Sequence, residues 1–161
     1  AWAKDPAIGA RAINARSETV GEKPAFRGAF RKRRCLVAAD GFYEWSGAPG
    51  HKVPYYFALR TGGPLAFAGL WEAWRAPTGD VVETCTILTT EANEVVRPVH
   101  PRMPVILPPD AYAVWLDPQV DQPGPLLPLL VPFDPSAMAG YRVSPRVNAV
   151  TNDDAECIQP L

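Results

Sequence analysis

The chain has 161 residues, of which 47% are hydrophobic and 20% are charged, and its formal net charge is −1. This composition is ordinary for a globular protein of a size that can bury a core, so we expect a single domain over residues 1–161. No apolar run approaches the roughly 18 residues of a membrane span and no signal peptide is visible, so we expect a soluble, cytoplasmic monomer with no membrane partner.

The charges are divided unevenly along the chain. Residues 1–80 hold 12 Lys/Arg and 7 Asp/Glu, a net charge of +5, whereas residues 81–161 hold 4 and 10, a net charge of −6. A basic face would suit a phosphate backbone, although solvated surface is the ordinary interpretation of such charge. The chain opens AWAKDP, without methionine, and we expect that N-terminal sequence is missing.

The first half of the chain predicts one helix followed by strands. AFRGAFRKRR, residues 25–34, predicts a short helix with Phe26 and Phe30 on its buried face. CLVAADGFYEW, residues 35–45, predicts a strand with a bulge or bend at Asp40-Gly41. Further strands, rich in β-branched and aromatic residues, are expected at 53–60, 64–74 and 81–90.

The second half has shorter elements separated by prolines. We expect a short helix or turn at 90–100, a strand at 102–108, a helix at 108–116, a proline-rich surface excursion at 119–135 and a final strand at 140–150. The predicted fold class is α+β, with a mostly antiparallel, curled sheet or barrel-like β core and short peripheral helices.

The metal-binding residue types are few. The cysteines are Cys35, Cys85 and Cys157, none in a C-x-x-C pair, and the histidines are His51 and His100. A zinc site needs about four ligands at workable spacing, so we expect no metal and no other cofactor. The thiols are expected to be buried in a reducing compartment.

Three short motifs hold the candidate chemical groups. In INARSET, residues 13–19, an extended backbone would place Asn14, Arg16 and Glu18 on one face, and the alternative is a turn with Arg16 and Glu18 paired at the surface. In ADGFYEW, residues 39–45, aromatic neighbours would raise the pKa of Glu44, as suits a general acid/base; the alternative is a solvent-facing edge position.

His100, in HPRMPV at 100–105, is the better histidine candidate. It lies between Pro98 and Pro101, so its backbone is stiff, and a rigidly held imidazole suits proton transfer. The alternative is a purely structural histidine, and His51, in a Gly/Pro turn, is expected to face solvent. No Gly-rich phosphate loop, H-E-x-x-H or G-x-S-x-G motif accompanies these residues.

The same motifs resemble the SOS response-associated peptidase (SRAP) family, the abasic-site processing proteins. The resemblance lies in W-A-K-D-P and I-N-A-R-S-E-T at 2–19, R-R-C-L-V-A-A-D-G-F-Y-E-W at 33–45, H-P-R-M-P-V at 100–105 and, more loosely, V-S-P-R-V-N-A-V with C-I-Q-P at 143–160. It implies binding of single-stranded DNA with abasic sites and self-processing peptidase activity. It also implies a covalent thiazolidine crosslink through an N-terminal cysteine.

The resemblance also implies residue roles. Asn14 would position the N-terminal cysteine, Glu44 would exchange protons with its amine and the carbinolamine, and His100 would promote opening of the sugar ring. Three DNA contacts are implied as well: Arg16 on a phosphate, Trp2 against bases, and Thr89 near the backbone.

The sequence departs from the family pattern at the nucleophile. None of the three cysteines stands at an N-terminus, so we expect this polypeptide by itself to lack the crosslinking step. Two other functions fit the residues: a non-catalytic module that binds single-stranded DNA, and, less well, a cysteine hydrolase that uses an internal thiol with His100.

Overall fold

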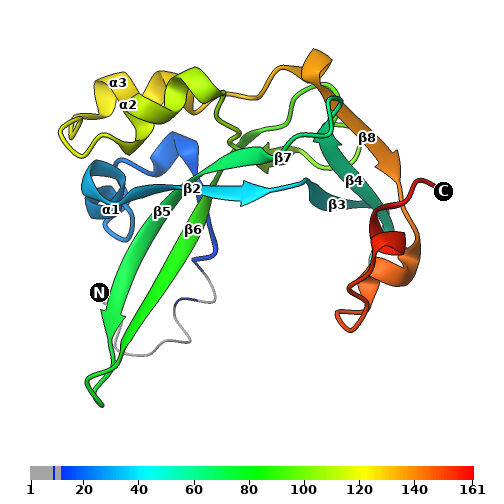
Figure 1. Cartoon of the computed structure of the whole chain (residues 1–161), viewed down its shortest axis with the longest axis horizontal. Helices are drawn as coiled ribbons and strands as arrows, with labels where there is room; N and C mark the ends of the chain where they lie inside the picture. Colours follow the sequence, from blue (N-terminus) through cyan, green and yellow to red (C-terminus); the bar gives the residue numbers. More distant parts are fainter. Residues whose placement is uncertain (1–8, 10–11) are drawn as a thin grey trace. The chain divides into compact units, whose positions relative to one another are not determined.

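The computed structural model describes Gly9 and residues 12–161 (Figure 1). The chain forms two compact units, each built from three separate segments. Unit 1 comprises Ala1–Val37, Ala66–Thr90 and Pro104–Pro132, and unit 2 comprises Ala38–Leu65, Glu91–Met103 and Phe133–Leu161. The organisation as a single domain stays a prediction.

The sheet of unit 1 combines parallel and antiparallel pairing. Its strands lie in the order β1 (Asn14–Arg16), β6 (Val81–Glu91), β5 (Leu65–Arg75) and β2 (Arg34–Ala39). β1 runs parallel to β6, with Ala15 opposite Leu88, and β5 runs antiparallel to β6. Because side chains alternate between faces, this register directs Ala15 and Leu88 to one face together.

That face carries the core of unit 1. Leu70 and Leu88 are buried there with Phe30 and Trp115, whose ring centroids lie 6.1 Å apart. The covering helices are α1 (Arg27–Lys32), α2 (Tyr112–Leu116) and α3 (Pro123–Leu126), with 3-10 turns at Ser17–Thr19, Pro109–Ala111 and Leu127–Leu129. The predicted helix at 108–116 is therefore confirmed, and the one at 25–34 is shorter than expected.

The proline content predicted a surface excursion at residues 119–135, but part of this segment is buried. Leu126 is fully buried and Leu130 nearly so, and both belong to the core of unit 1. Proline composition marks where a regular element stops, but it does not report whether an isolated leucine between prolines packs inward.

Unit 2 contains a three-stranded antiparallel sheet. Its strands lie in the order β3 (Phe42–Ser46), β4 (Val53–Leu59) and β8 (Met138–Arg142) (Figure 1). The predicted strand at 140–150 is wrong beyond Arg142, because the chain turns into a 3-10 turn at Pro145–Asn148 that Ser144 caps. Further 3-10 turns lie at Pro135–Ala137 and Ala155–Ile158. The short strand β7 (Arg102–Pro104) follows His100 and is the fifth strand of the first sheet, where it pairs with β6.

Asp40-Gly41 is the bend that the sequence predicted as one of two alternatives, and it separates two strands of different sheets rather than forming a bulge within one strand. β2 ends at Ala39 in the first sheet and β3 begins at Phe42 in the second. A Cβ atom on Gly41 would lie 2.4 Å from the Phe57 carbonyl oxygen and 2.4 Å from Tyr56 Cζ. Only glycine lets the backbone approach β4 so closely at the point where β3 begins.

The α+β class is confirmed: strands dominate, and the helices are short. Within residues 12–161 neither sheet closes into a barrel. Among the described helices, none combines the length and the apolar character that crossing a membrane would require.

Candidate functional site

Glu44 and His100, two of the three predicted catalytic residues, lie beside one another in unit 2. Glu44 Oε1 is 3.6 Å from His100 Nδ1, and the side chains are 23% and 41% exposed. The residues are 56 positions apart in the chain, and β3 and the turns before β7 bring them together. A carboxyl group and an imidazole at this separation can exchange a proton with each other or with a bound substrate.

The position of Glu44 follows from the alternation of β3. Glu44 pairs with Tyr55 of β4 and Phe42 pairs with Phe57, so these four side chains share one face. The Phe42 and Phe57 rings stack at 5.3 Å. β3 is an edge strand, as the alternative interpretation supposed, but the carboxyl group lies beside His100 and is mostly buried.

Burial raises the pKa of Glu44 above its ordinary value. Three influences oppose the rise in pKa: the nearby His100, the nearby Lys52, and a hydrogen bond from the Trp45 backbone N–H. Desolvation is the largest of the four, so the pKa stays raised. A carboxyl group with a raised pKa holds its proton closer to neutral pH and can act as an acid as well as a base.

Backbone groups of Arg102 hold the His100 ring through Nδ1. Nδ1 lies 3.0 Å from the Arg102 carbonyl oxygen and 3.2 Å from the Arg102 backbone N–H, and it also faces the Glu44 carboxylate. The N–H donates to Nδ1 when this nitrogen carries no hydrogen, and the carbonyl accepts from Nδ1 when it does. Both contacts engage Nδ1, so Nε2 is the ring nitrogen that can face a substrate.

Asn93 is a residue that the sequence prediction missed. Its buried side chain accepts hydrogen bonds from the backbone N–H groups of Val95 and Val96, both at 3.1 Å, and donates to the Phe133 carbonyl at 2.9 Å. The His100 N–H in turn donates to the Val96 carbonyl. Asn93 therefore fixes the turns that carry His100; an asparagine followed two and three residues later by turn residues is the only signal for it in the sequence.

Asn14, Arg16 and Thr89 lie in unit 1. β1 exposes Asn14 and Arg16 and buries Ala15 between them, and Arg16 pairs in register with Thr89. The chain then enters the 3-10 turn at Ser17–Thr19, so the extended alternation expected to include Glu18 ends at Arg16. Within the described part of the chain, neither the Asn14 nor the Arg16 side chain makes a hydrogen bond or an ion pair.

The remaining predicted residues are placed as follows. Trp2 lies outside the described residues. His51 is exposed, as predicted. Cys157 is buried and Cys35 half-buried, but Cys85 is exposed, contrary to the expectation of three buried thiols. Burial raises the pKa of the Cys35 thiol, which makes it a weaker nucleophile at neutral pH. No group of three or more potential metal ligands occurs among residues 12–161.

A shallow groove of about 490 Å³ also lies on unit 2, next to β3. Trp45 lines it, with the indole Nε1 donating to Asn148 Oδ1 at 2.8 Å. Because Trp45 and Glu44 point to opposite faces of β3, the groove lies on the other side of the strand from the Glu44–His100 pair. Its remaining lining residues are Gly50, Lys52, Val147 and Val150.

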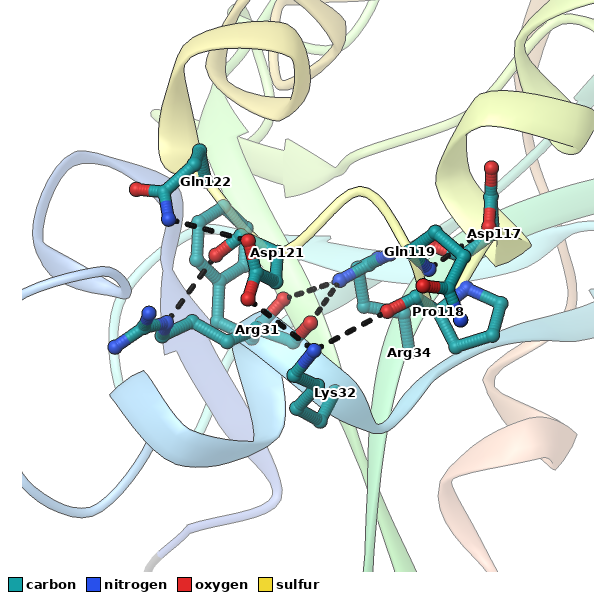
Figure 2. Close-up of polar contacts among 9 residues, drawn as sticks. Arg31, Lys32, Arg34, Asp117, Pro118, Gln119, Asp121 and Gln122 are labelled. Atoms are coloured by element: carbon teal, nitrogen blue, oxygen red, sulfur yellow. Dashed lines mark hydrogen bonds and ion pairs between the residues drawn. The ribbon is translucent and has the colours of Figure 1, made fainter.

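The basic run at 31–34 is engaged within unit 1 (Figure 2). Arg34 is buried and donates to four backbone carbonyl oxygens, those of Trp115 (2.5 Å), Phe30 (2.8 Å), Arg31 (2.7 Å) and Asp117 (2.5 Å). Lys32 Nζ pairs with Asp121 at 3.2 Å, Arg31 donates to the Asp121 carbonyl, and Arg33 pairs with Glu72. These cations therefore hold helix ends and loops in place.

Comparison with known proteins adds a family to this geometry. The family model for the SOS response associated peptidase (SRAP) matches residues 1–150. The abasic site processing protein YoqW of Bacillus subtilis (strain 168) is 45% identical over 159 residues, which cover 98% of this chain and 71% of that protein. The abasic site processing protein HMCES of Gallus gallus is 36% identical over 169 residues, covering 92% of this chain and 50% of that protein.

Two crystal structures of bacterial proteins are similar in fold. A protein from Bacteroides thetaiotaomicron superposes with a TM-score of 0.90 at 29% identity, covering 99% of this chain and 72% of its own. A protein from Bordetella bronchiseptica superposes with a TM-score of 0.74 at 32% identity, covering 88% of this chain and 72% of its own.

Proposed function

The chain belongs to the SOS response associated peptidase (SRAP) family, and from this membership we propose that it recognises and processes abasic sites in single-stranded DNA. The observation that carries the proposal is the Glu44–His100 pair, with its 3.6 Å separation and the raised pKa of Glu44. An abasic site presents an aldehyde in equilibrium with a closed sugar ring, and its chemistry consists of proton transfers around that carbon.

His100 acts first, on the closed sugar. Opening the ring breaks the bond between C1′ and the ring oxygen, with a proton lost from the C1′ hydroxyl and a proton gained by the ring oxygen. The imidazolium form of His100 supplies that proton from Nε2, since Nδ1 is held by the Arg102 carbonyl. The hydroxyl proton passes to water.

Glu44 acts next, on the open aldehyde. A primary amine attacks C1′ and forms a carbinolamine, after Glu44 has taken a proton from the ammonium form. Protonated Glu44 then returns the proton to the carbinolamine hydroxyl, which leaves as water and yields the Schiff base. A thiol on the same residue as the amine closes a thiazolidine by adding to that carbon of the protonated Schiff base, and its S–H proton passes to water. The amine belongs to an N-terminal cysteine, and Cys35, Cys85 and Cys157 are internal.

The unit 1 residues contribute positioning and DNA contacts. Asn14, exposed on β1, orients the cysteine through its amide, and the Arg16 guanidinium binds a phosphate beside the lesion. Thr89 lies next to Arg16 and contacts the DNA backbone, and Trp2 packs against a base. We assign peptidase activity to self-processing that exposes the N-terminal cysteine.

The test is adduct formation by the protein expressed from its native gene. Incubation with a single-stranded oligonucleotide carrying one abasic site should give a band of retarded mobility on a denaturing gel. Glu44→Gln and His100→Ala should form it at least about 10²-fold more slowly, the usual contribution of an acid–base group, and Asn14→Ala should also lose it. His51→Ala, the other histidine, is the matched control and should match wild type.

Two outcomes would contradict the proposal. Undiminished adduct formation by Glu44→Gln, His100→Ala and Asn14→Ala would remove these role assignments. Equal affinity for abasic and intact strands, with no adduct from the native protein, would identify a non-catalytic module that binds single-stranded DNA.

A further inference from the structure

The sheet face that carries Glu44 is covered over only part of its area. At one end, Phe57 and Met138 are fully buried. The Phe57 ring lies over Gly140, where an added Cβ would meet it at 2.4 Å and Val95 at 3.4 Å. The segment Glu91–Met103 therefore covers this end of the face, down to His100 beside Glu44.

The other end of the same face is open. Glu44, Tyr55 and Arg142 lie opposite one another on β3, β4 and β8, and side chains paired in register share a face. Tyr55 is half-exposed and Arg142 is exposed. Adjacent strands are about 4.8 Å apart, so the Arg142 backbone is roughly 10 Å from that of Glu44 across Tyr55.

Arg142 is an unpaired cation on this open area. Among the described residues its guanidinium makes no hydrogen bond, ion pair or aromatic contact, and its backbone carbonyl accepts from the Leu161 N–H. The Tyr55 hydroxyl likewise has no partner there, and its ring stacks on Phe57 at 6.5 Å. An exposed aromatic ring flanked by an unpaired arginine is a combination that binds the sugar–phosphate backbone of single strands.

We propose that Arg142 binds a backbone phosphate of the DNA strand whose abasic sugar lies against Glu44 and His100, with the intervening sugar over Tyr55. This inference rests on the proposed function and adds a phosphate contact on unit 2. The distance of roughly 10 Å between the two backbones suits an arginine side chain that reaches toward the phosphate next to the lesion. A phosphate bound at Arg142 would neutralise the guanidinium charge. It would also lie too far from the Glu44 carboxyl group for strong repulsion.

The test compares Arg142→Gln with Arg60→Gln in binding a fluorescently labelled single strand that carries one abasic site, by anisotropy over a range of NaCl concentrations. Arg60 is an exposed arginine just beyond β4, next to Leu59 at its far end, and its guanidinium donates to the Ser136 carbonyl. Arg142→Gln should weaken binding about tenfold at low salt and reduce the slope of log K against log salt by about 0.7, one phosphate contact. Arg60→Gln should stay within about twofold of wild type.

Arg142→Gln should also weaken binding of intact and abasic strands by the same factor, because a phosphate contact does not depend on the base. Arg142→Lys should restore part of the affinity and the whole salt slope. Wild-type affinity and slope in Arg142→Gln would overturn this inference while leaving the proposed function in place. Failure of the wild-type protein to bind abasic strands would overturn both.

Discussion

Glu44 is a residue whose ionised form opposes the stability of the fold. Its carboxyl group is three-quarters buried among aromatic neighbours, and desolvation outweighs the help of His100, Lys52 and the Trp45 N–H. An ionised carboxylate is therefore less stable here than in the unfolded chain. The same desolvation raises the pKa of the Glu44 carboxyl group, which in the proposed function would let it return a proton to a departing hydroxyl.

The raised pKa predicts a pH-dependent gain in stability for Glu44→Gln. Below the ordinary pKa of 4.5 both folded and unfolded chains are protonated at this position, and the substitution should change stability little. As pH rises from 4.5 through the raised native pKa, the unfolded chain ionises more readily, so wild type loses stability and the glutamine variant does not. Thermal unfolding at pH 4 to 8 should show a Tm difference that grows with pH in favour of the variant.

Glu91→Gln is the control for the loss of a negative charge alone, because Glu91 is an exposed glutamate at the end of β6. A Glu44→Gln protein that is less stable than wild type at pH 8 would contradict the argument, since it would mean that the ionised carboxylate is net favourable in the fold.

At the scale of elements, the junction between β2 and β3 places the strictest limit on side-chain size. The strands belong to different sheets and are joined by Asp40 and Gly41. The Gly41 backbone lies in close contact with Phe57 and Tyr56. The register of β3 on β4, and hence the direction in which Glu44 points, begins at this contact. A side chain at Gly41 would move the start of β3 away from β4.

Gly41→Ala should therefore destabilise the protein by about 2–3 kcal/mol, the cost of forcing extra volume into a close-packed contact. Urea denaturation measures this, and adduct formation should fall with it. Gly124→Ala in α3 is the matched control, because an added Cβ there meets nothing within 4 Å. It should be neutral or stabilising by up to about 1 kcal/mol, as expected for alanine in a helix. Equal stability of the two variants would contradict the role of Gly41.

Much of the strand content could be predicted from sequence, because β-branched and aromatic alternation is local. The alternation of ADGFYEW correctly separates Phe42 and Glu44 from Tyr43 and Trp45. Contact between Glu44 and His100 could not be predicted from spacing, since it depends on how Asn93 folds a segment far along the chain. The last strand was overextended because VSPRVNAV has strand-like residues, while Ser144 and Pro145 start a 3-10 turn.

At the scale of the whole molecule, the density of positive charge along the chain does not indicate which cations lack a partner among the described residues. The densest basic run, residues 31–34, contributes much of the positive charge in the first half of the chain, yet its side chains are tied to carbonyl oxygens and to Glu72 and Asp121. Arg16 and Arg142 are exposed with no ion pair among the described residues. The basic run at 31–34 therefore differs from Arg16 and Arg142 in having hydrogen-bond and ion-pair partners, not only in its density of charge.

Replacing Arg31 and Lys32 together by glutamine should therefore change affinity for abasic single strands by less than about twofold at 0.15 M salt. Arg16→Gln should weaken it about tenfold, as expected for loss of one charged phosphate contact. Anisotropy titrations under one salt condition measure both. Greater loss in the double variant than in Arg16→Gln would show that the basic run reaches the DNA.

The segment pattern of the two units limits how such a protein can be taken apart. The chain passes between the units after residues 37, 65, 90, 103 and 132, so no continuous stretch encodes either one. Glu44 and His100 belong to one unit but are separated in the gene by a segment of the other. Exchange of a gene fragment that spans a segment boundary would thus transfer parts of both units, and transplanting Glu44 and His100 without unit 1 requires at least two insertions.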